Sequence, residues 1–153
     1  MTSKDRWSDL APRLISAIVM LLLGGSAVWA GGLIFDILIA LCCGTLIWEL
    51  VRMLAPGSRA VALQLGLLCG AATLAAALLP LVWVLPLLVA PALVGLSQLS
   101  QHRGYYFVFT LWVLIAGFGF GWLRSEFGMS WVIWLMGVVV VTDVAGYFAG
   151  KII

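Results

Sequence analysis

Long apolar stretches, each close to 20 residues and separated by short polar segments, constrain the fold of this chain more than any other feature. A helix needs about 20 mostly apolar residues to cross the hydrocarbon core of a bilayer. Of the 153 residues, 65% are hydrophobic and 9% are charged, whereas a soluble domain carries about 25% charged residues. So few charges cannot form a polar shell, and disordered chains lack this apolar content. We therefore predict an all-α integral membrane protein.

Glycines, prolines and charges divide the chain into six predicted spans. These spans are residues 14–31, 35–52, 61–79, 81–97, 105–123 and 131–150. A glycine pair beginning at Gly31, together with Asp36, supplies the turn of a tight hairpin between the first two spans. Pro86 and Pro91 are expected to kink the fourth span, which membrane helices tolerate. The prediction is a polytopic membrane helix bundle of about six transmembrane helices. It forms a single transmembrane domain over residues 1–153, with no separate soluble domain.

The distribution of basic residues tests this count, because the short cytoplasmic loops of membrane proteins carry an excess of Lys and Arg. With six spans, one side of the membrane receives seven basic residues, namely Lys4, Arg6, Arg13, Arg52, Arg59, Arg103 and Lys151. The other side receives Arg124, which Glu126 offsets. We therefore expect both ends in the cytoplasm. Small residues near Ala30 also fit a signal-peptide cleavage site loosely, but the apolar core is long and further spans follow at once.

The cysteines and the single histidine indicate no metal or redox site. Cys42, Cys43 and Cys69 fall inside apolar stretches, without the Cys-x-x-Cys or Cys/His spacing of a zinc site. We interpret them as small residues that face the core or the lipid, and His102 as a solvated loop residue. No basic run with interleaved aromatic residues is present, so no nucleic-acid partner is expected.

Two carboxylates fall inside predicted spans, where a charge costs roughly 2.5–3.5 kcal/mol on insertion scales. Glu49 lies three residues before Arg52, a helical spacing that allows an ion pair near the cytoplasmic interface. Asp143 has no basic residue within four positions. Its partner must come from another helix, a metal ion or a ligand, unless the carboxyl is protonated. A neutral Asp bonded at a helix contact is the alternative to a functional role.

The residues after Asp143 place it on a distinctive helix face. Asp143, Tyr147 and Gly150 recur at i, i+4 and i+7 and therefore share one face. Gly146 and Gly150 have the spacing that lets another helix backbone approach closely. We interpret this face as the wall of a polar cavity in the cytoplasmic half of the membrane. The same spacing without a charge, which we interpret as helix packing, occurs at Gly66 with Gly70 and at Gly117 with Gly121.

The segment from Thr142 to Lys151 resembles the pattern Ser/Thr-Asp-x-Gly/Ala-x-Tyr-x-x-Gly-Arg/Lys of phosphatidate cytidylyltransferase, the bacterial CDP-diacylglycerol synthase. The run Arg13-Leu-Ile-Ser-Ala-Ile is similar to the entry of that family's first helix. Trp48-Glu49-Leu is similar to the end of its second helix, and residues 124–128 also fit. The resemblance covers essentially the whole chain, but only about the N-terminal half of the family's longer chain.

The resemblance implies an enzyme of phospholipid biosynthesis in the bacterial inner (cytoplasmic) membrane, which it crosses several times. The family condenses CTP with phosphatidic acid and releases CDP-diacylglycerol and pyrophosphate. Both substrates are polyanions, so Mg²⁺ must neutralise phosphate charge during the transfer. The resemblance implies Asp143 as a catalytic and metal-binding candidate. It also implies Lys151 as a catalytic and substrate-binding candidate, and Tyr147 and Gly150 as substrate-binding candidates.

The implied partners are phosphatidic acid, CTP and membrane lipid, with a homodimer as one candidate assembly. The C-terminal half of the family carries much of its catalytic and metal-binding machinery, so we expect no CDP-diacylglycerol formation from this chain alone. Two other classes stay open. One is a small membrane transporter subunit that uses Asp143 as an ion or proton site. The other is a non-catalytic scaffold that packs through its glycine pairs.

Overall fold

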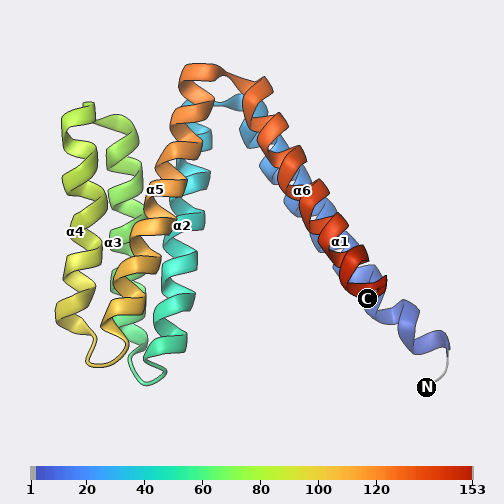
Figure 1. The fold of residues 1–153 in the computed structure, drawn as a ribbon, viewed down its shortest axis with the longest axis horizontal. Helices are drawn as coiled ribbons and strands as arrows, with labels where there is room; N and C mark the ends of the chain where they lie inside the picture. Colours follow the sequence, from blue (N-terminus) through green and yellow to red (C-terminus); the bar gives the residue numbers. More distant parts are fainter. Residues whose placement is uncertain (1–2, 153) are drawn as a thin grey trace.

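The protein is a set of helices joined by very short connections in a computed structural model that describes residues 3–152 (Figure 1). Its side chains are described over residues 15–150, apart from residue 17. In chain order the elements are α1 (Ser3–Ala30), α2 (Gly32–Leu54), α3 (Arg59–Leu78), the short 3₁₀ helix η1 (Leu81–Trp83), α4 (Val84–Gln98), α5 (Arg103–Phe127) and α6 (Met129–Ile152). The described residues include no strand, and each predicted span matches one helical segment. The predicted all-α class is therefore confirmed.

The helices have the length and apolar composition of membrane spans. Among the described residues, five segments are long and apolar enough to cross a bilayer, namely α2, α3, η1 with α4, α5 and α6. The described apolar part of α1, Ile18–Ala30, is shorter. Large apolar side chains are exposed along every long helix. Lipid accepts such surfaces, and helices satisfy their own backbone groups, so the chain is a multi-pass helical membrane protein.

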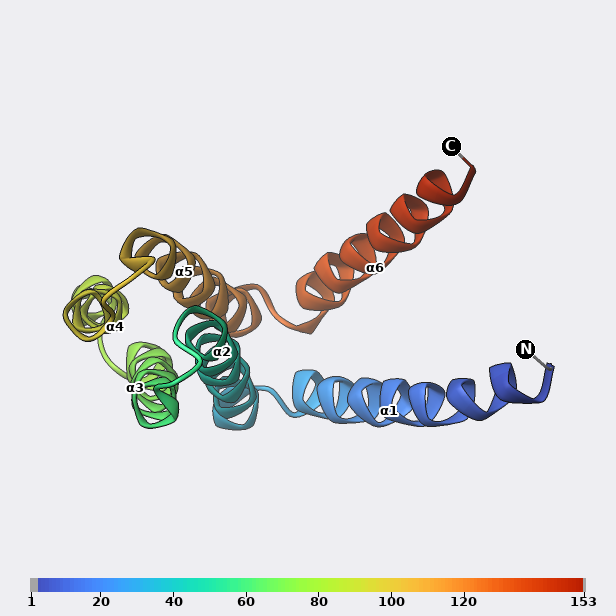
Figure 2. The same cartoon turned by 90° about the horizontal axis from the view of Figure 1, so that it is seen from below.

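Helices α2 to α5 form a four-helix bundle, from which α1 and α6 diverge as two arms (Figure 2). The bundle core contains fully buried Ile47, Leu65 and Leu114 from three different helices. Tyr106 is also fully buried, and its hydroxyl donates to the Pro91 carbonyl oxygen at 3.1 Å. Cys43 and Cys69 are buried, Cys42 is exposed, and all three thiols are free, which confirms their interpretation as core- or lipid-facing residues.

Glycines bring α2 and α3 into close backbone contact. A Cβ atom at Gly44 would lie 2.8 Å from the Gly66 carbonyl oxygen, and one at Gly66 would lie 2.8 Å from the Gly44 carbonyl oxygen. A Cβ atom at Gly70 would lie 3.0 Å from the Ala40 carbonyl oxygen. In α5, a side chain at Gly117 would collide with the Cys43 thiol. The prediction of helix packing through these glycines is confirmed.

The turn between α1 and α2 is shorter than predicted, and the prediction that Asp36 belongs to it is wrong. Gly31 and Gly32 have positive φ angles of 65° and 50°, which glycine adopts without steric penalty. These two residues reverse the chain on their own, so α2 begins at Gly32 and Asp36 lies one turn inside the helix. The prediction erred because a glycine pair alone is sufficient for this reversal.

The fourth span begins with a 3₁₀ turn. Pro80 precedes this turn, η1 covers Leu81–Trp83, and α4 continues from Val84. Pro86 lies in the first turn of α4, where a missing backbone N–H removes no helical hydrogen bond. Pro91 lies inside α4 and is buried in the bundle. The change from 3₁₀ to α-helical geometry therefore occurs before Pro86, between η1 and α4.

Charge is distributed unequally between the two ends of the bundle. The α2–α3 and α4–α5 loops lie together at the lower end of Figure 1, next to Arg52, Arg59 and Arg103. We call this the basic end. The α1–α2, α3–α4 and α5–α6 connections lie at the other end, which we call the opposite end and which contains Arg124. This arrangement matches the alternation used to predict the orientation from basic residues.

Candidate functional site

The candidate site residues lie on α6, which is anchored at its beginning and open along the rest of its length. Gly128, with a φ of 86°, separates α5 from α6. Val132 is fully buried and packs in a cluster with Val28 of α1 and Phe35 of α2. Every side chain from residue 136 to residue 150 is exposed. The first turns of α6 therefore hold the helix against the bundle, and the later turns form a free arm.

Asp143 lies on this arm, eleven residues beyond Val132, which corresponds to about 16 Å along the helix axis. Its side chain is exposed, and no ion pair of Asp143 occurs among the described side chains. The hydroxyl of Thr142 donates to the Val138 carbonyl oxygen at 2.5 Å, one turn back along the same helix. Asp143 is thus a carboxylate on an apolar helix, open to a partner that the described bundle does not supply.

Tyr147 and Gly150 follow Asp143 on the same face of α6. Tyr147 is 66% exposed, and its ring lies edge-on to Phe148 with the ring centroids 5.8 Å apart. A Cβ atom at Gly146 or Gly150 would meet nothing within 4 Å. The predicted close approach of another backbone therefore does not occur within the described chain. The side chain of Lys151 lies outside the described residues.

One carboxylate limits how this chain could hold Mg²⁺. Among the described residues, no group of three or more His, Cys, Asp or Glu side chains is placed to bind a metal ion. Mg²⁺ is usually bound through one or two carboxylates together with substrate phosphates and water. Asp143 fits this way of binding Mg²⁺ as a single carboxylate ligand, with phosphate oxygens and water as the remaining ligands.

Glu49 and Arg52 form the ion pair that their spacing predicts. Arg52 Nη1 lies 3.5 Å from Glu49 Oε1, and the two side chains are 44% and 53% exposed. The Arg52 guanidinium also lies over the Trp48 ring, 5.0 Å from its centroid. The pair sits at the basic end of the bundle, and the predicted pairing of Glu49 with Arg52 is confirmed.

The carboxylate of Asp36 lies in the bundle, whereas the sequence pattern predicts it in a turn. Asp36 lines a cavity of about 70 Å³ together with Thr73, Gly121 and Ser125. A Cβ atom at Gly121 would lie 3.2 Å from Asp36 Oδ1, so the glycine makes room for the carboxylate. The hydroxyls of Thr73 and Ser125 donate to carbonyls of their own helices. Because Gly121 is 85 positions from Asp36, only the folded chain reveals this cavity.

Comparison with known proteins identifies one family. The sequence model of the cytidylyltransferase family matches residues 11–153, which is nearly the whole chain and includes all of α2 to α5 and the Asp143 face. No curated protein matches the chain significantly. No solved structure matches it significantly either.

Proposed function

We propose, because this chain belongs to the cytidylyltransferase family, that it transfers the cytidylyl group of CTP to the phosphate of phosphatidic acid. Family membership supports a CTP-dependent nucleotidyltransferase. The multi-pass helical architecture supports an acceptor that resides in the membrane, since the exposed surface of α6 is apolar on both sides of Asp143. The observation that carries the proposal is the open Asp143 face, which the family match includes.

In the proposed reaction, a phosphate oxygen of phosphatidic acid attacks the α-phosphorus of CTP. The bond between that phosphorus and the oxygen bridging to the β-phosphate breaks, so CDP-diacylglycerol forms and pyrophosphate leaves. Mg²⁺, when bound, neutralises phosphate charge. Asp143 would hold the ion, and the ammonium group of Lys151, two turns further on, would contact a phosphate.

The openness of the Asp143 face suits a lipid acceptor. A phosphatidic acid molecule moves within the leaflet and can reach an exposed helix face without leaving the bilayer. Tyr147 lies one turn from Asp143 on that face and would place its phenol near the headgroup. Gly150 leaves open space around the helix one turn closer to the cytoplasm. Asp143, Tyr147 and Gly150 thus give α6 one polar and open face, along which the headgroup would lie.

Asp143→Asn introduced into the native gene tests the proposal in native membranes. With CTP, Mg²⁺ and phosphatidic acid, we expect the variant to form CDP-diacylglycerol on the order of 100-fold more slowly, the range seen when one charge-stabilising group is removed. Because the side chain is exposed, we expect the free energy of unfolding of the variant to stay within about 0.5 kcal/mol of the wild-type value. Glu126→Gln, an exposed carboxylate near the end of α5, is the matched control.

Wild-type turnover and unchanged Mg²⁺ dependence in Asp143→Asn would exclude this role for Asp143. The chain alone is expected to form no CDP-diacylglycerol, but native membranes also contain its native partners. An absence of CDP-diacylglycerol formation in native membranes that contain the wild-type protein would therefore contradict the proposed reaction itself. In that case, ion or proton flux through liposomes containing the protein, abolished by Asp143→Asn, would support the transporter class instead.

A further inference from the structure

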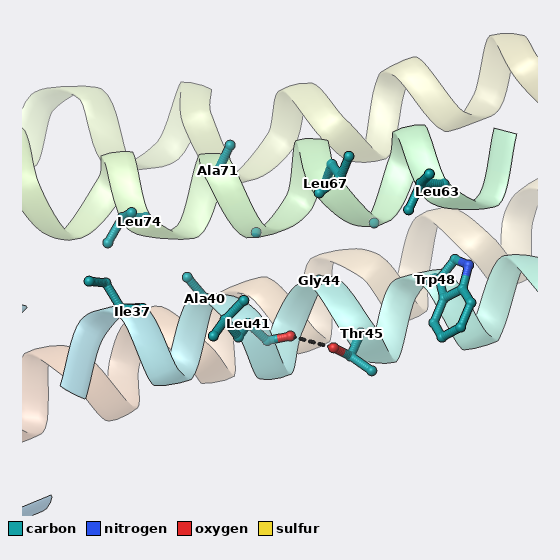
Figure 3. A pocket seen from close by; sticks show the side chains of 12 residues that line it. Ile37, Ala40, Leu41, Gly44, Thr45, Trp48, Leu63, Leu67, Ala71 and Leu74 are labelled. Atoms are coloured by element: carbon teal, nitrogen blue, oxygen red, sulfur yellow. Dashed lines mark hydrogen bonds between the residues drawn. The ribbon is translucent and has the colours of Figure 1, made fainter. Parts of the chain in front are cut away.

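An apolar groove of about 370 Å³ runs between α2 and α3 on the surface of the bundle (Figure 3). Its floor includes the glycines that bring the two helices together, Gly44, Gly66 and Gly70. Leu41 of α2 and Leu67 of α3 stand on its two walls and are more than 60% exposed. No described residue of α6 lines the groove. It is therefore separate from the Asp143 face, and the inference does not rest on the proposed function.

The groove has the length of one leaflet. On α2 it extends from Ile37 to Trp48, a separation of eleven positions, or about 16 Å along the helix. The hydrocarbon core of a bilayer is about 30 Å thick, so the groove covers about half of it. The hydroxyl of Thr45, which lines the groove, donates to the Leu41 carbonyl at 2.7 Å (Figure 3). The groove therefore presents an apolar surface of one-leaflet depth.

The groove ends among aromatic and cationic groups. Trp48 closes it toward the basic end (Figure 3), where tryptophans lie near lipid headgroups. Arg52 is one turn beyond Trp48 on α2 and contacts its ring. Arg59 is exposed one turn before Leu63, on the line of α3 that forms the other wall. The first turn of α3 adds the positive end of a 20-residue helix.

Glu49 reduces this positive charge without cancelling it. The carboxylate contacts Arg52 through Nη1, and a guanidinium has further N–H donors to offer an anion. Arg59 has no ion pair among the described side chains. The end of the groove therefore carries an excess positive charge, at the depth where a phospholipid phosphate sits when its acyl chain fills the groove.

We propose that the α2–α3 groove is a binding site for an anionic phospholipid of the surrounding bilayer, such as phosphatidylglycerol. One acyl chain fills the groove, and the phosphodiester is bound by Arg52 and Arg59. The glycines create the groove, because side chains at those positions would fill its floor and push α2 and α3 apart. Lipid with a zwitterionic headgroup binds less well, because its own cation competes for the phosphate.

Photo-crosslinking with phosphatidylglycerol that carries a diazirine in its acyl chain tests this site in nanodiscs. We expect crosslinks to concentrate on the groove walls, and excess unlabelled phosphatidylglycerol to suppress them more strongly than phosphatidylcholine does. Arg52→Gln and Arg59→Gln should each weaken the labelling by about fivefold, the effect of one basic residue near a membrane surface. Ala71→Phe, which fills the groove from an exposed position, should reduce labelling as well, whereas Ala116→Phe on the exposed face of α5 should not.

Three results would overturn the proposal. The first is groove labelling no stronger than labelling of the exposed face of α5. The second is equal competition by phosphatidylglycerol and phosphatidylcholine, a comparison on the wild-type protein that needs no variant to fold. The third is labelling displaced by phosphatidic acid but not by phosphatidylglycerol, which would make the groove a site for the proposed substrate rather than for a bilayer lipid.

Discussion

Arg124 links α5 to the end of α1 through one side chain. Its Nε atom donates to the Val28 carbonyl oxygen at 2.8 Å, and Nη2 lies 3.5 Å from the Trp29 carbonyl oxygen. These carbonyls belong to the last turn of α1, where a positive charge is also favoured by the helix dipole. A Cβ atom at Gly31 would lie 2.6 Å from Nη2. Gly31 is therefore required both for its backbone conformation and for the room it leaves to the guanidinium.

Gly31→Ala should destabilise the protein. The φ of 65° and ψ of −163° at Gly31 lie in a region essentially restricted to glycine, which costs another residue about 1–3 kcal/mol. Displacing Arg124 adds the loss of its hydrogen bonds. We expect a lower thermal unfolding temperature in detergent, together with a weaker association of α1 with the bundle. Gly25→Ala, in the exposed middle of α1 with nothing within 4 Å, should have no such effect. Equal unfolding temperatures for the two variants would refute the role assigned to Gly31.

Buried Tyr106 and its exposed neighbour Tyr105 allow a matched test of one hydrogen bond in the bundle core. Tyr106→Phe removes the buried hydrogen bond to the Pro91 carbonyl, and we expect a loss of about 0.5–1.5 kcal/mol in the free energy of unfolding. Tyr105 is 74% exposed, so Tyr105→Phe should be neutral. Unfolding of both variants in the same detergent measures the difference, and a neutral Tyr106→Phe would show that the bond does not stabilise the fold.

Residue-level predictions from the sequence succeeded where the interaction is local. The Glu49–Arg52 pair is three positions apart on one helix, so helical geometry alone brings the two groups together. The approach of Gly121 to Asp36 and the Arg124 contacts join residues 85 or more positions apart. No periodicity within a single helix contains that information, since it depends on how α5 is rotated against α1 and α2.

At the scale of elements, the α2–α3 contact depends on glycine. Gly44→Ala places a methyl group 2.8 Å from the Gly66 carbonyl oxygen, and such overpacking typically costs about 1–3 kcal/mol. We expect a corresponding loss of stability, measured by thermal unfolding in detergent. Gly119→Ala on α5, where nothing lies within 4 Å, is the control. A Gly44→Ala protein as stable as this control would mean that the two helices can separate without penalty.

Helices were predictable from hydropathy because each must cross the same apolar layer, which sets its length. Their lateral arrangement was not predictable, because a lipid-facing and a helix-facing side chain are equally apolar in this sequence. The divergence of α1 and α6 from the bundle is the clearest example. The small-residue spacing at Gly66 and Gly70 marks a real contact, whereas the same spacing at Gly146 and Gly150 faces open space in the described chain.

At the scale of the whole molecule, the predicted orientation can be tested by labelling. Ser58→Cys and Gln101→Cys place thiols in the two loops of the basic end, and Glu126→Cys places one near the opposite end. We expect a membrane-impermeant maleimide to label Cys at 126 in intact cells, and to label the other two positions only after the cells are opened. The wild type, whose three cysteines lie in apolar helices, gives the background. The reverse pattern would invert the predicted topology.

The sequence predicts Asp143 and its face as a candidate site, because an acidic side chain inside a Val-rich span is energetically costly. It could not indicate what surrounds that face. In the folded chain the side chains of Asp143 and Tyr147 are exposed, because α6 diverges from the bundle beyond Val132 (Figure 2). A partner for this face would therefore approach α6 from outside the described bundle.

The contact between Arg124 and Val28 also imposes an order on biosynthesis. The two residues are 96 positions apart, and ribosomes add roughly 5–20 residues per second. For about 5–20 seconds after the last turn of α1 has been synthesised, Arg124 has therefore not yet been added to the chain. The carbonyls at the end of α1 lack their hydrogen bonds to the guanidinium during this time. During that interval the α1–α2 hairpin is held by its glycine turn and by the packing of Val28 near Phe35, and the arrival of α5 adds the Arg124 hydrogen bonds to the end of α1.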